Sequence, residues 1–150
     1  MIPSSIELAR KGGNPTVICR MSSGWAVLCE WQFLSGYTIL LADPPVLSLN
    51  TLKIEESHLF LRDMKIIGDT LLETTDAYRI NYQILGNLEP FLHAHICPRY
   101  QWEKPDLRSG PIEYYNKTKG PTFDLNRDQE LKGKIQKAIE LRVGKTNSTQ

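Results

Sequence analysis

The 150-residue chain is 41% hydrophobic and 23% charged, and its 18 Lys and Arg against 17 Asp and Glu give a formal net charge of +1. This size and balance predict a single globular domain over residues 1–150 with a sizeable core. The small net charge gives no long-range attraction to DNA or to an anionic membrane, so neither is expected as a partner.

The first part of the chain predicts a short helix and then a β-meander. An amphipathic helix is expected over Ser4–Lys11, with a serine at its start and Gly12 and Gly13 at its end. Three β-rich runs follow, over Thr16–Met21, Trp25–Glu30 and Tyr37–Ala42. Consecutive prolines after Asp43 then take the chain out of the sheet.

The period becomes helical over Glu55 to about Thr74, where Phe60, Met64, Ile67 and Leu71 form one buried stripe. Two more strands are predicted, over Tyr78–Leu85 and over Leu92–Cys97, the second ended by Pro98. Residues 101–122, rich in Pro and Gly, predict an ordered surface excursion in which the Tyr114–Tyr115 pair packs. A last helix is expected over about Asn126–Val143, before a polar tail, Lys145–Gln150.

The chain shows no signal for export or for membrane insertion. Its start lacks a basic region with an apolar stretch behind it, and no segment approaches the roughly 18 apolar residues of a membrane helix. We therefore expect a cytoplasmic protein. Cys19, Cys29 and Cys97 are odd in number and lie in apolar runs, which predicts reduced core thiols.

The most informative stretch is Asn81–Tyr100, NYQILGNLEPFLHAHICPRY. On a strand, Phe91, His93 and His95 point one way, while the apolar residues between them point the other way. Two imidazoles at i and i+2 can bind a metal, exchange protons, or place one ring as nucleophile beside a phosphate. They can equally be partly buried structural histidines, and the spacing alone does not choose among these uses.

This stretch resembles the signature strand of the histidine triad (HIT) family, Gly-Asn-x-x-Pro followed by His-φ-His-φ-His-φ-φ-Pro-Arg, where φ is apolar. Phe91 stands where the first histidine of the triad is expected, and upstream Tyr37 stands where the family's Pro-Gly-His strand has histidine. Outside that resemblance, Arg99 would simply pair with a surface carboxylate, worth about 0–1 kcal/mol. The matching residues are Gly86, Asn87, Pro90, His93, His95, Pro98 and Arg99.

The resemblance spans roughly Val17–Tyr100, and residues 101–150 follow it as a C-terminal loop and helix. Within the family, the chain most resembles the bacterial dinucleoside polyphosphate hydrolase-like members. It implies an α+β fold: a five-stranded antiparallel sheet, a long helix between strands 3 and 4, and flanking N- and C-terminal helices. It also implies a homodimer in which one sheet edge pairs across a twofold axis and the histidines lie outside the interface.

The resemblance also assigns roles to residues. His93 matches the middle histidine, which attacks the α-phosphorus and carries a nucleotidyl-histidine intermediate, and His95 matches the histidine that contacts the phosphate or leaving group. Asn81 and Asn87 fall at substrate-binding positions, where an amide can donate to phosphate. Glu30 falls near the residue that meets the ribose hydroxyls.

The leading hypothesis is therefore a nucleotide hydrolase or nucleotidyl transferase that acts on the α-phosphate of a dinucleoside polyphosphate or nucleoside phosphoramidate, with no cofactor and no metal. The first alternative is a nucleotide-binding module with a degenerate, inactive site, because Phe91 and Tyr37 replace two histidines. The second alternative is a metal-binding protein that uses His93 and His95, since zinc sites need three or four N or S ligands.

Overall fold

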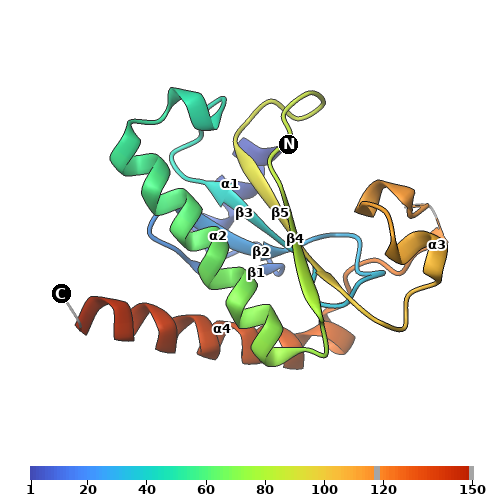
Figure 1. Cartoon of the computed structure of the whole chain (residues 1–150). Helices are drawn as coiled ribbons and strands as arrows, with labels where there is room; N and C mark the ends of the chain where they lie inside the picture. The colour runs from blue at the N-terminus through green and yellow to red at the C-terminus, as the bar shows by residue number, and fades with distance from the viewer. Residues whose placement is uncertain (117–118, 149–150) are drawn as a thin grey trace.

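Five antiparallel strands form one sheet, in the order β1-β2-β3-β5-β4, in the computed structural model, which describes residues 1–116 and 119–148 (Figure 1). The predicted meander is confirmed, and β5 lies between β3 and β4 because the helix after β3 carries the chain past it to the sheet edge. The strands are β1 (Val17–Arg20), β2 (Gly24–Leu28), β3 (Thr38–Ala42), β4 (Arg79–Gln83) and β5 (His93–Arg99). The helical elements are α1 (Ile2–Arg10), η1 (Leu49–Thr51), α2 (Ile54–Thr74), α3 (Pro105–Arg108), η2 (Ile112–Tyr114) and α4 (Leu125–Ser148).

Helices cover both faces of this sheet. Figure 1 shows α2 in front of the strands and α1 behind them. The predicted stripe of α2 is confirmed, because its four residues are buried with Ile135 and Ile139 of α4 against one face of the sheet. On the opposite face, Ile2 and Ile6 of α1 pack on Val27 and Leu41. At the other end of this face Leu34 and Ile112 pack with Cys29 and Cys97, so the region between the two covered ends is left for a site.

Two predicted boundaries were wrong because of proline. Helix α1 begins at Ile2 rather than at Ser4, since Pro3 lies in the first turn, where its missing N–H costs nothing. Strand β5 continues through Pro98 to Arg99. Because β3 pairs with β5 only as far as Ile96, residue 98 has a neighbouring strand on one side only, and proline is tolerated there.

The C-terminal helix is longer than the sequence pattern indicates. Helix α4 runs over Leu125–Ser148, so residues 145–148 of the predicted polar tail are helical, and residues 149–150 lie outside the described residues. Polar side chains do not oppose a helix once it has been nucleated, because each added residue gains a backbone hydrogen bond. The helix was predicted to end at Val143 because the apolar residues end there. The last apolar residue marks the end of the packed face of the helix, but the helix itself continues.

Arg99 does not pair with a surface carboxylate, which corrects that interpretation. Its side chain is 2% exposed and meets the fully buried side chain of Glu103, with Nη2 2.8 Å from Oε1. The same guanidinium donates to the carbonyl oxygens of Leu107 and Gly110, at 2.9 and 2.7 Å. These bonds satisfy the buried charge and attach the segment containing α3 to the end of β5.

The surface excursion over residues 101–122 packs as predicted, through Tyr115. Its ring stacks on Phe33 with centroids 4.8 Å apart, and its hydroxyl donates to Glu103 Oε1 at 2.6 Å. Tyr114, by contrast, is 61% exposed. The excursion contains α3 and η2, and its residues 117–118 lie outside the described residues.

Cys19, Cys29 and Cys97 form no disulfide, as predicted; Cys29 and Cys97 are buried and Cys19 is partly buried. In the described part of the chain, every helix is too short or too polar to cross a membrane.

We predict that Glu103→Gln lowers the free energy of unfolding by about 3–5 kcal/mol, because it leaves the Arg99 charge buried without its partner. Burial alone would raise the pKa of Glu103, but hydrogen bonds from Arg99, Tyr115 and the Tyr100 amide hold it below its usual range. The loss should therefore be complete above the unfolded-state pKa of about 4.3 and shrink as pH falls through the lower native pKa.

Urea unfolding from pH 7 to pH 3 measures this difference. The control is Asp69→Asn, which breaks the exposed pair with Lys65 and should cost less than about 1 kcal/mol. Equal losses in the two variants would contradict the role given to the buried pair.

Candidate functional site

Strand β5 presents its two histidines on the face that α1 only partly covers. Leu92, Ala94 and Ile96 are at most 2% exposed in the core under α2. The alternation of a strand then places His93 and His95 on the other face, as predicted. Across the sheet, His93 lies beside Leu41 and His95 beside Ile39, both on β3.

The His93 ring is held by a main-chain carbonyl. Its Nδ1 lies 2.7 Å from the carbonyl oxygen of Phe91, and the residue is 8% exposed. A carbonyl oxygen can only accept, so Nδ1 carries the ring proton in this bond. In the neutral ring Nε2 then has a free lone pair, which is what a nucleophile or base requires. The Phe91 side chain takes no part in this bond.

The His95 ring is held by Tyr37, whose hydroxyl lies 2.5 Å from Nδ1. Tyr37 is 2% exposed, and its burial beside the Cys97 and Cys29 thiols raises the pKa of the phenol far above its ordinary value. The phenol therefore keeps its proton at neutral pH and can donate it to Nδ1. His95 would then carry its own proton on Nε2, as a donor. Gly36, just before Tyr37 and two residues before β3, has a φ of +92°, a conformation that glycine adopts without strain.

Together the two rings can act as a hydrogen-bond acceptor and donor pair. Their centroids are 5.0 Å apart and their planes meet at 71°, edge to face. The partners of the two Nδ1 atoms allow opposite tautomers, in which Nε2 of His93 has the lone pair and Nε2 of His95 has the N–H. Such a pair can attack an electrophile and stabilise negative charge beside it.

A pocket of about 450 Å³ adjoins the histidines on the β3 side. We call it the β3-side pocket. Its floor includes Ile39 and Leu41, the cross-strand neighbours of the histidines, and one wall includes Ile2 and Leu8 of α1. Glu30 lies in its lining and is exposed. The lining is largely apolar and includes two carboxylates, those of Glu30 and Glu89, which suits a flat apolar group attached to hydroxyls.

The structure brings together some of the predicted site residues and not others. His93, His95 and Glu30 border one surface. Asn81 lies on β4 opposite Cys97, and its Oδ1 accepts from Arg99 Nη1 at 2.7 Å. Asn87 is exposed on the loop before β5.

Two neighbours of His95 were not among the predicted site residues. Gln83 of β4 pairs with His95 in the sheet register. Tyr37 was interpreted as the loss of a family histidine, yet it supplies the hydrogen bond to Nδ1. The sequence could have indicated Tyr37 as a site residue, because it directly precedes β3, the strand beside β5. Gln83 could not be identified in this way, because its pairing with His95 depends on the register between two strands that are separated by a loop.

Within residues 1–116 and 119–148, no three side chains of His, Cys, Asp or Glu are grouped closely enough to hold a metal ion. The metal-binding hypothesis therefore finds no third ligand for His93 and His95 in that part of the chain.

No protein-family model and no curated protein matches the sequence. Solved structures do match the fold. A histidine triad protein from Sinorhizobium meliloti is 18% identical with a TM-score of 0.72, over 88% of this chain and 93% of that one. One from Marinobacter aquaeolei is 20% identical with a TM-score of 0.72, over 83% and 88%. A hypothetical histidine triad nucleotide-binding protein from Sulfolobus tokodaii is 13% identical with a TM-score of 0.70, over 91% of each. The predicted fold class is confirmed: the chain has the histidine triad fold.

We predict that neutral His93 carries its proton on Nδ1, because the Phe91 carbonyl can only accept. Two-bond ¹H–¹⁵N correlation spectra at a pH where the imidazoles are neutral measure the tautomer. Phe91→Leu keeps the carbonyl and should keep the tautomer, and His58, exposed on α2, serves as the reference ring. A proton on His93 Nε2 would show that the carbonyl does not orient the ring.

Proposed function

We propose that this chain is a cytoplasmic nucleotide hydrolase or nucleotidyl transferase that acts on an α-phosphate through a nucleotidyl-histidine intermediate at His93. The observation that carries the proposal is the bond from His93 Nδ1 to the Phe91 carbonyl oxygen, which leaves Nε2 free to attack. The lone pair of Nε2 would form the P–N bond as the bond from phosphorus to the leaving group breaks. Water or another acceptor would then attack phosphorus and release the nucleotide from His93.

His95 would bind the phosphate or protonate the leaving group. Tyr37 supports this role, because a hydroxyl that donates to Nδ1 leaves the N–H of His95 on Nε2. A donor aimed at developing negative charge is worth roughly 2.7–4 kcal/mol in the transition state. The substrate would be a dinucleoside polyphosphate or a nucleoside phosphoramidate.

The β3-side pocket would hold the nucleoside. Its apolar floor can take a base, and the Glu30 carboxylate at its edge can accept hydrogen bonds from both ribose hydroxyls. Asn81 keeps a free Nδ2 donor, because its Oδ1 is occupied by Arg99, and it would contact substrate beyond His95. Asn87, exposed on its loop, stays a prediction as a substrate contact.

The alternative is a nucleotide-binding module without turnover. Phe91 favours it, because a phenyl ring replaces a polar group of the triad and packs, partly buried, against α1. Against it, the two remaining histidines keep a hydrogen-bonding partner at each Nδ1. The two functions differ in one measurement, the release of product from a bound nucleotide.

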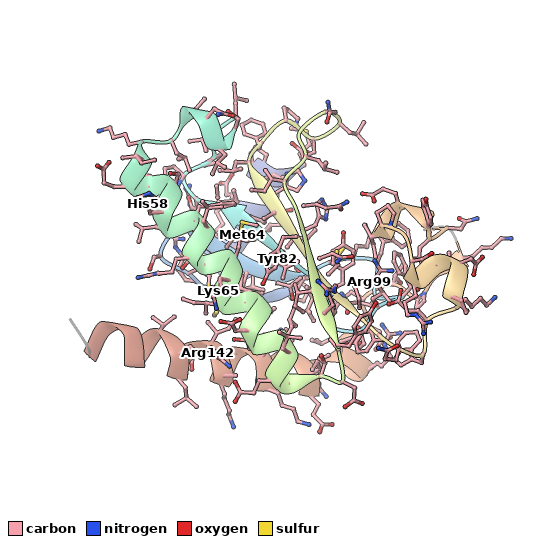
Figure 2. The ribbon with its side chains drawn as sticks, viewed as in Figure 1. His58, Met64, Lys65, Tyr82, Arg99 and Arg142 are labelled. Atoms are coloured by element: carbon pink, nitrogen blue, oxygen red, sulfur yellow. The ribbon has the colours of Figure 1, made fainter. Side chains whose placement is uncertain are left out.

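We expect His93→Asn to lower turnover of a dinucleoside tetraphosphate at least about 10³-fold while nucleotide affinity stays within a few-fold, because the lost bond exists only on the reaction path. His95→Asn should weaken binding as well as turnover, by about 10²–10³ in rate. His58→Asn removes the third histidine of the chain, on α2 and away from β5, and should change neither (Figure 2).

The intermediate gives a direct readout. Acid-labile label from an α-³²P nucleotide should appear on the parent protein and be absent from His93→Asn. An active His93→Asn protein would overturn the mechanism, whereas a parent that binds nucleotide without turnover would be the inactive module.

We also propose a homodimer that pairs through β4, with the histidines outside the interface. The outer edge of β4 has no strand beside it in the described residues, whereas β1 at the other edge is contacted by α4. Exposed apolar side chains flank this edge, and Figure 2 shows Tyr82 reaching from β4 towards α2. They are Tyr78, just before β4, and Tyr82, on β4, which are 42% and 43% exposed. An unpaired edge with an apolar border suits isologous pairing.

The expected mass at micromolar concentration is twice the chain mass of 17.1 kDa, measured by light scattering. Tyr82→Glu should give the monomer mass, because two carboxylates would meet near the twofold axis. Leu141→Glu, at a 67% exposed position on α4, should leave the dimer intact. A parent protein with the mass of one chain would refute the dimer.

A further inference from the structure

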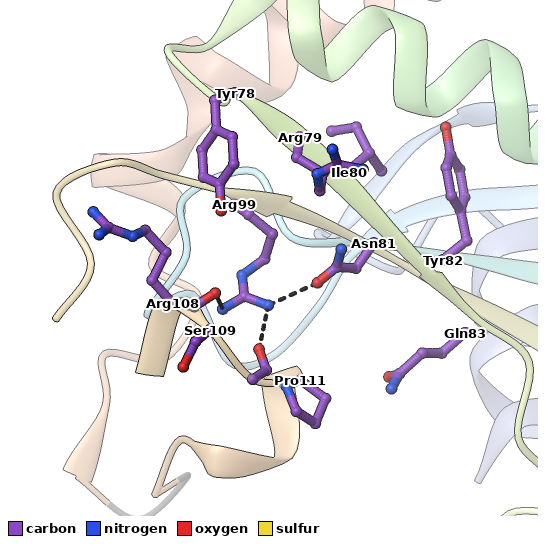
Figure 3. Close-up of a pocket in the computed structure, with 11 residues that line it drawn as sticks. Tyr78, Arg79, Ile80, Asn81, Tyr82, Gln83, Arg99, Arg108, Ser109 and Pro111 are labelled. Carbon is purple, nitrogen blue, oxygen red and sulfur yellow. Dashed lines mark hydrogen bonds between the residues drawn. The ribbon is translucent and has the colours of Figure 1, made fainter. Parts of the chain in front are cut away.

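A second pocket lies on the β4 side of the histidines, opposite the β3-side pocket. Its volume is about 520 Å³, and it is formed between β4 and the segment over residues 108–111 (Figure 3). We call it the β4-side pocket. Gln83 in its lining pairs with His95, while Asn81 and Arg79 pair with Cys97 and Arg99 further along. Cross-strand partners share a face of the sheet, so the pocket continues the surface of the histidines.

The lining of this pocket is cationic. It contains three guanidinium groups, from Arg79, Arg99 and Arg108, and no carboxylate. Arg99 is neutralised by Glu103, but Arg79 and Arg108 form no salt bridge within the described residues. Arg108 donates one side-chain hydrogen bond to the described residues, from Nη1 to the Gln101 carbonyl at 2.7 Å. Two charges therefore remain for a ligand.

Donors in the pocket are oriented before any ligand binds. In Figure 3 the Arg99 guanidinium points between β4 and the 108–111 segment, where it donates to Asn81 Oδ1 and to the Gly110 carbonyl, both at 2.7 Å. The first bond fixes the Asn81 amide with Nδ2 as the free donor. Gln83 is different, because its Nε2 donates to Glu113, whose carboxylate marks the acidic end of the region.

We propose that the β4-side pocket binds the oligophosphate part of the ligand whose α-phosphate meets His93, using Arg79, Arg108 and the Asn81 amide. This rests on the function proposed above. The β3-side pocket lies beside both histidines, whereas the β4-side pocket begins at Gln83, the partner of His95, and extends along β4 to Arg79, the partner of Arg99. An extended phosphate chain with its α-phosphorus over β5 would enter the β4-side pocket from the Gln83 end. Guanidinium groups bind phosphate oxygens through charge-assisted hydrogen bonds, and an uncharged amine would gain nothing from them. The substrate class is then a nucleotide with an oligophosphate leaving group, not a phosphoramidate.

Pairing of β4 across a dimer axis does not compete with this use. Strand pairing engages backbone groups in the plane of the sheet, whereas the side chains of Arg79 and Asn81 project from one face of it. A dimer would therefore leave both side chains directed into the β4-side pocket.

The binding test uses inorganic tripolyphosphate and calorimetry, and needs no turnover. The double variant Arg79→Gln/Arg108→Gln should raise the dissociation constant at least about tenfold and flatten its dependence on salt, because two charged contacts are lost. The control, Arg62→Gln/Lys137→Gln, removes the same charge from α2 and α4 and should stay within about twofold of the parent. The proposed anion-binding role of the pocket would be contradicted if the parent does not bind tripolyphosphate, or if both double variants have equal effects.

The turnover test separates this inference from the proposed function. For a dinucleoside tetraphosphate the arginine variant should lose about tenfold in kcat/KM, while for a nucleoside 5′-phosphoramidate the change should be within about twofold. Equal losses on the two substrates would overturn the leaving-group assignment. If the parent turns over neither substrate but binds tripolyphosphate, and the binding depends on the two arginines, the proposed enzymatic function is refuted and the anion-binding pocket is supported.

Discussion

The alternation of side chains along β5 is the constraint on which the site depends. This strand lies between β3 and β4, so its backbone is paired with β3 over His93–Ile96 and with β4 over His95–Arg99. Burial of Leu92, Ala94 and Ile96 under α2 fixes which face each residue takes, because a shift of one residue would put the histidines into the core. The same hydrophobic contacts that stabilise the domain therefore also orient its two imidazoles.

The other end of β5 organises the second pocket. Arg99 is among the most buried side chains of the protein, and its guanidinium joins the sheet, Glu103 and the carbonyl groups of the 107–110 segment. A guanidinium suits this place because its five N–H donors lie in one plane and can satisfy several acceptors at once. The Arg99 guanidinium thus holds the segment that closes the β4-side pocket, and its own charge is neutralised by Glu103. The other two arginines of the pocket, Arg79 and Arg108, are the ones proposed to bind a ligand.

The hydrogen bonds of the two imidazoles depend on the backbone of residue 91 and on the side chain of Tyr37. The His93 ring is bound by the backbone of residue 91, so the side chain at that position can be apolar. The His95 ring needs a donor or acceptor at Nδ1, and the Tyr37 hydroxyl lies 2.5 Å from it. An apolar side chain at position 91 and a phenol at position 37 set the polarity around the pair, and each imidazole has a partner that can set its tautomer.

The sequence by itself determined the local elements and the faces of the strands, because periods of two and of 3.6 residues are local properties of the chain. The stripe of α2, the β-meander, and the placing of His93 and His95 opposite the core all follow from such patterns. The burial of Arg99, the bond from Tyr37 to His95 and the pairing of Gln83 with His95 were decided only by the tertiary structure. Each joins residues from separate strands or loops, and the register and packing that bring them together are set by the whole core rather than by any segment of the sequence.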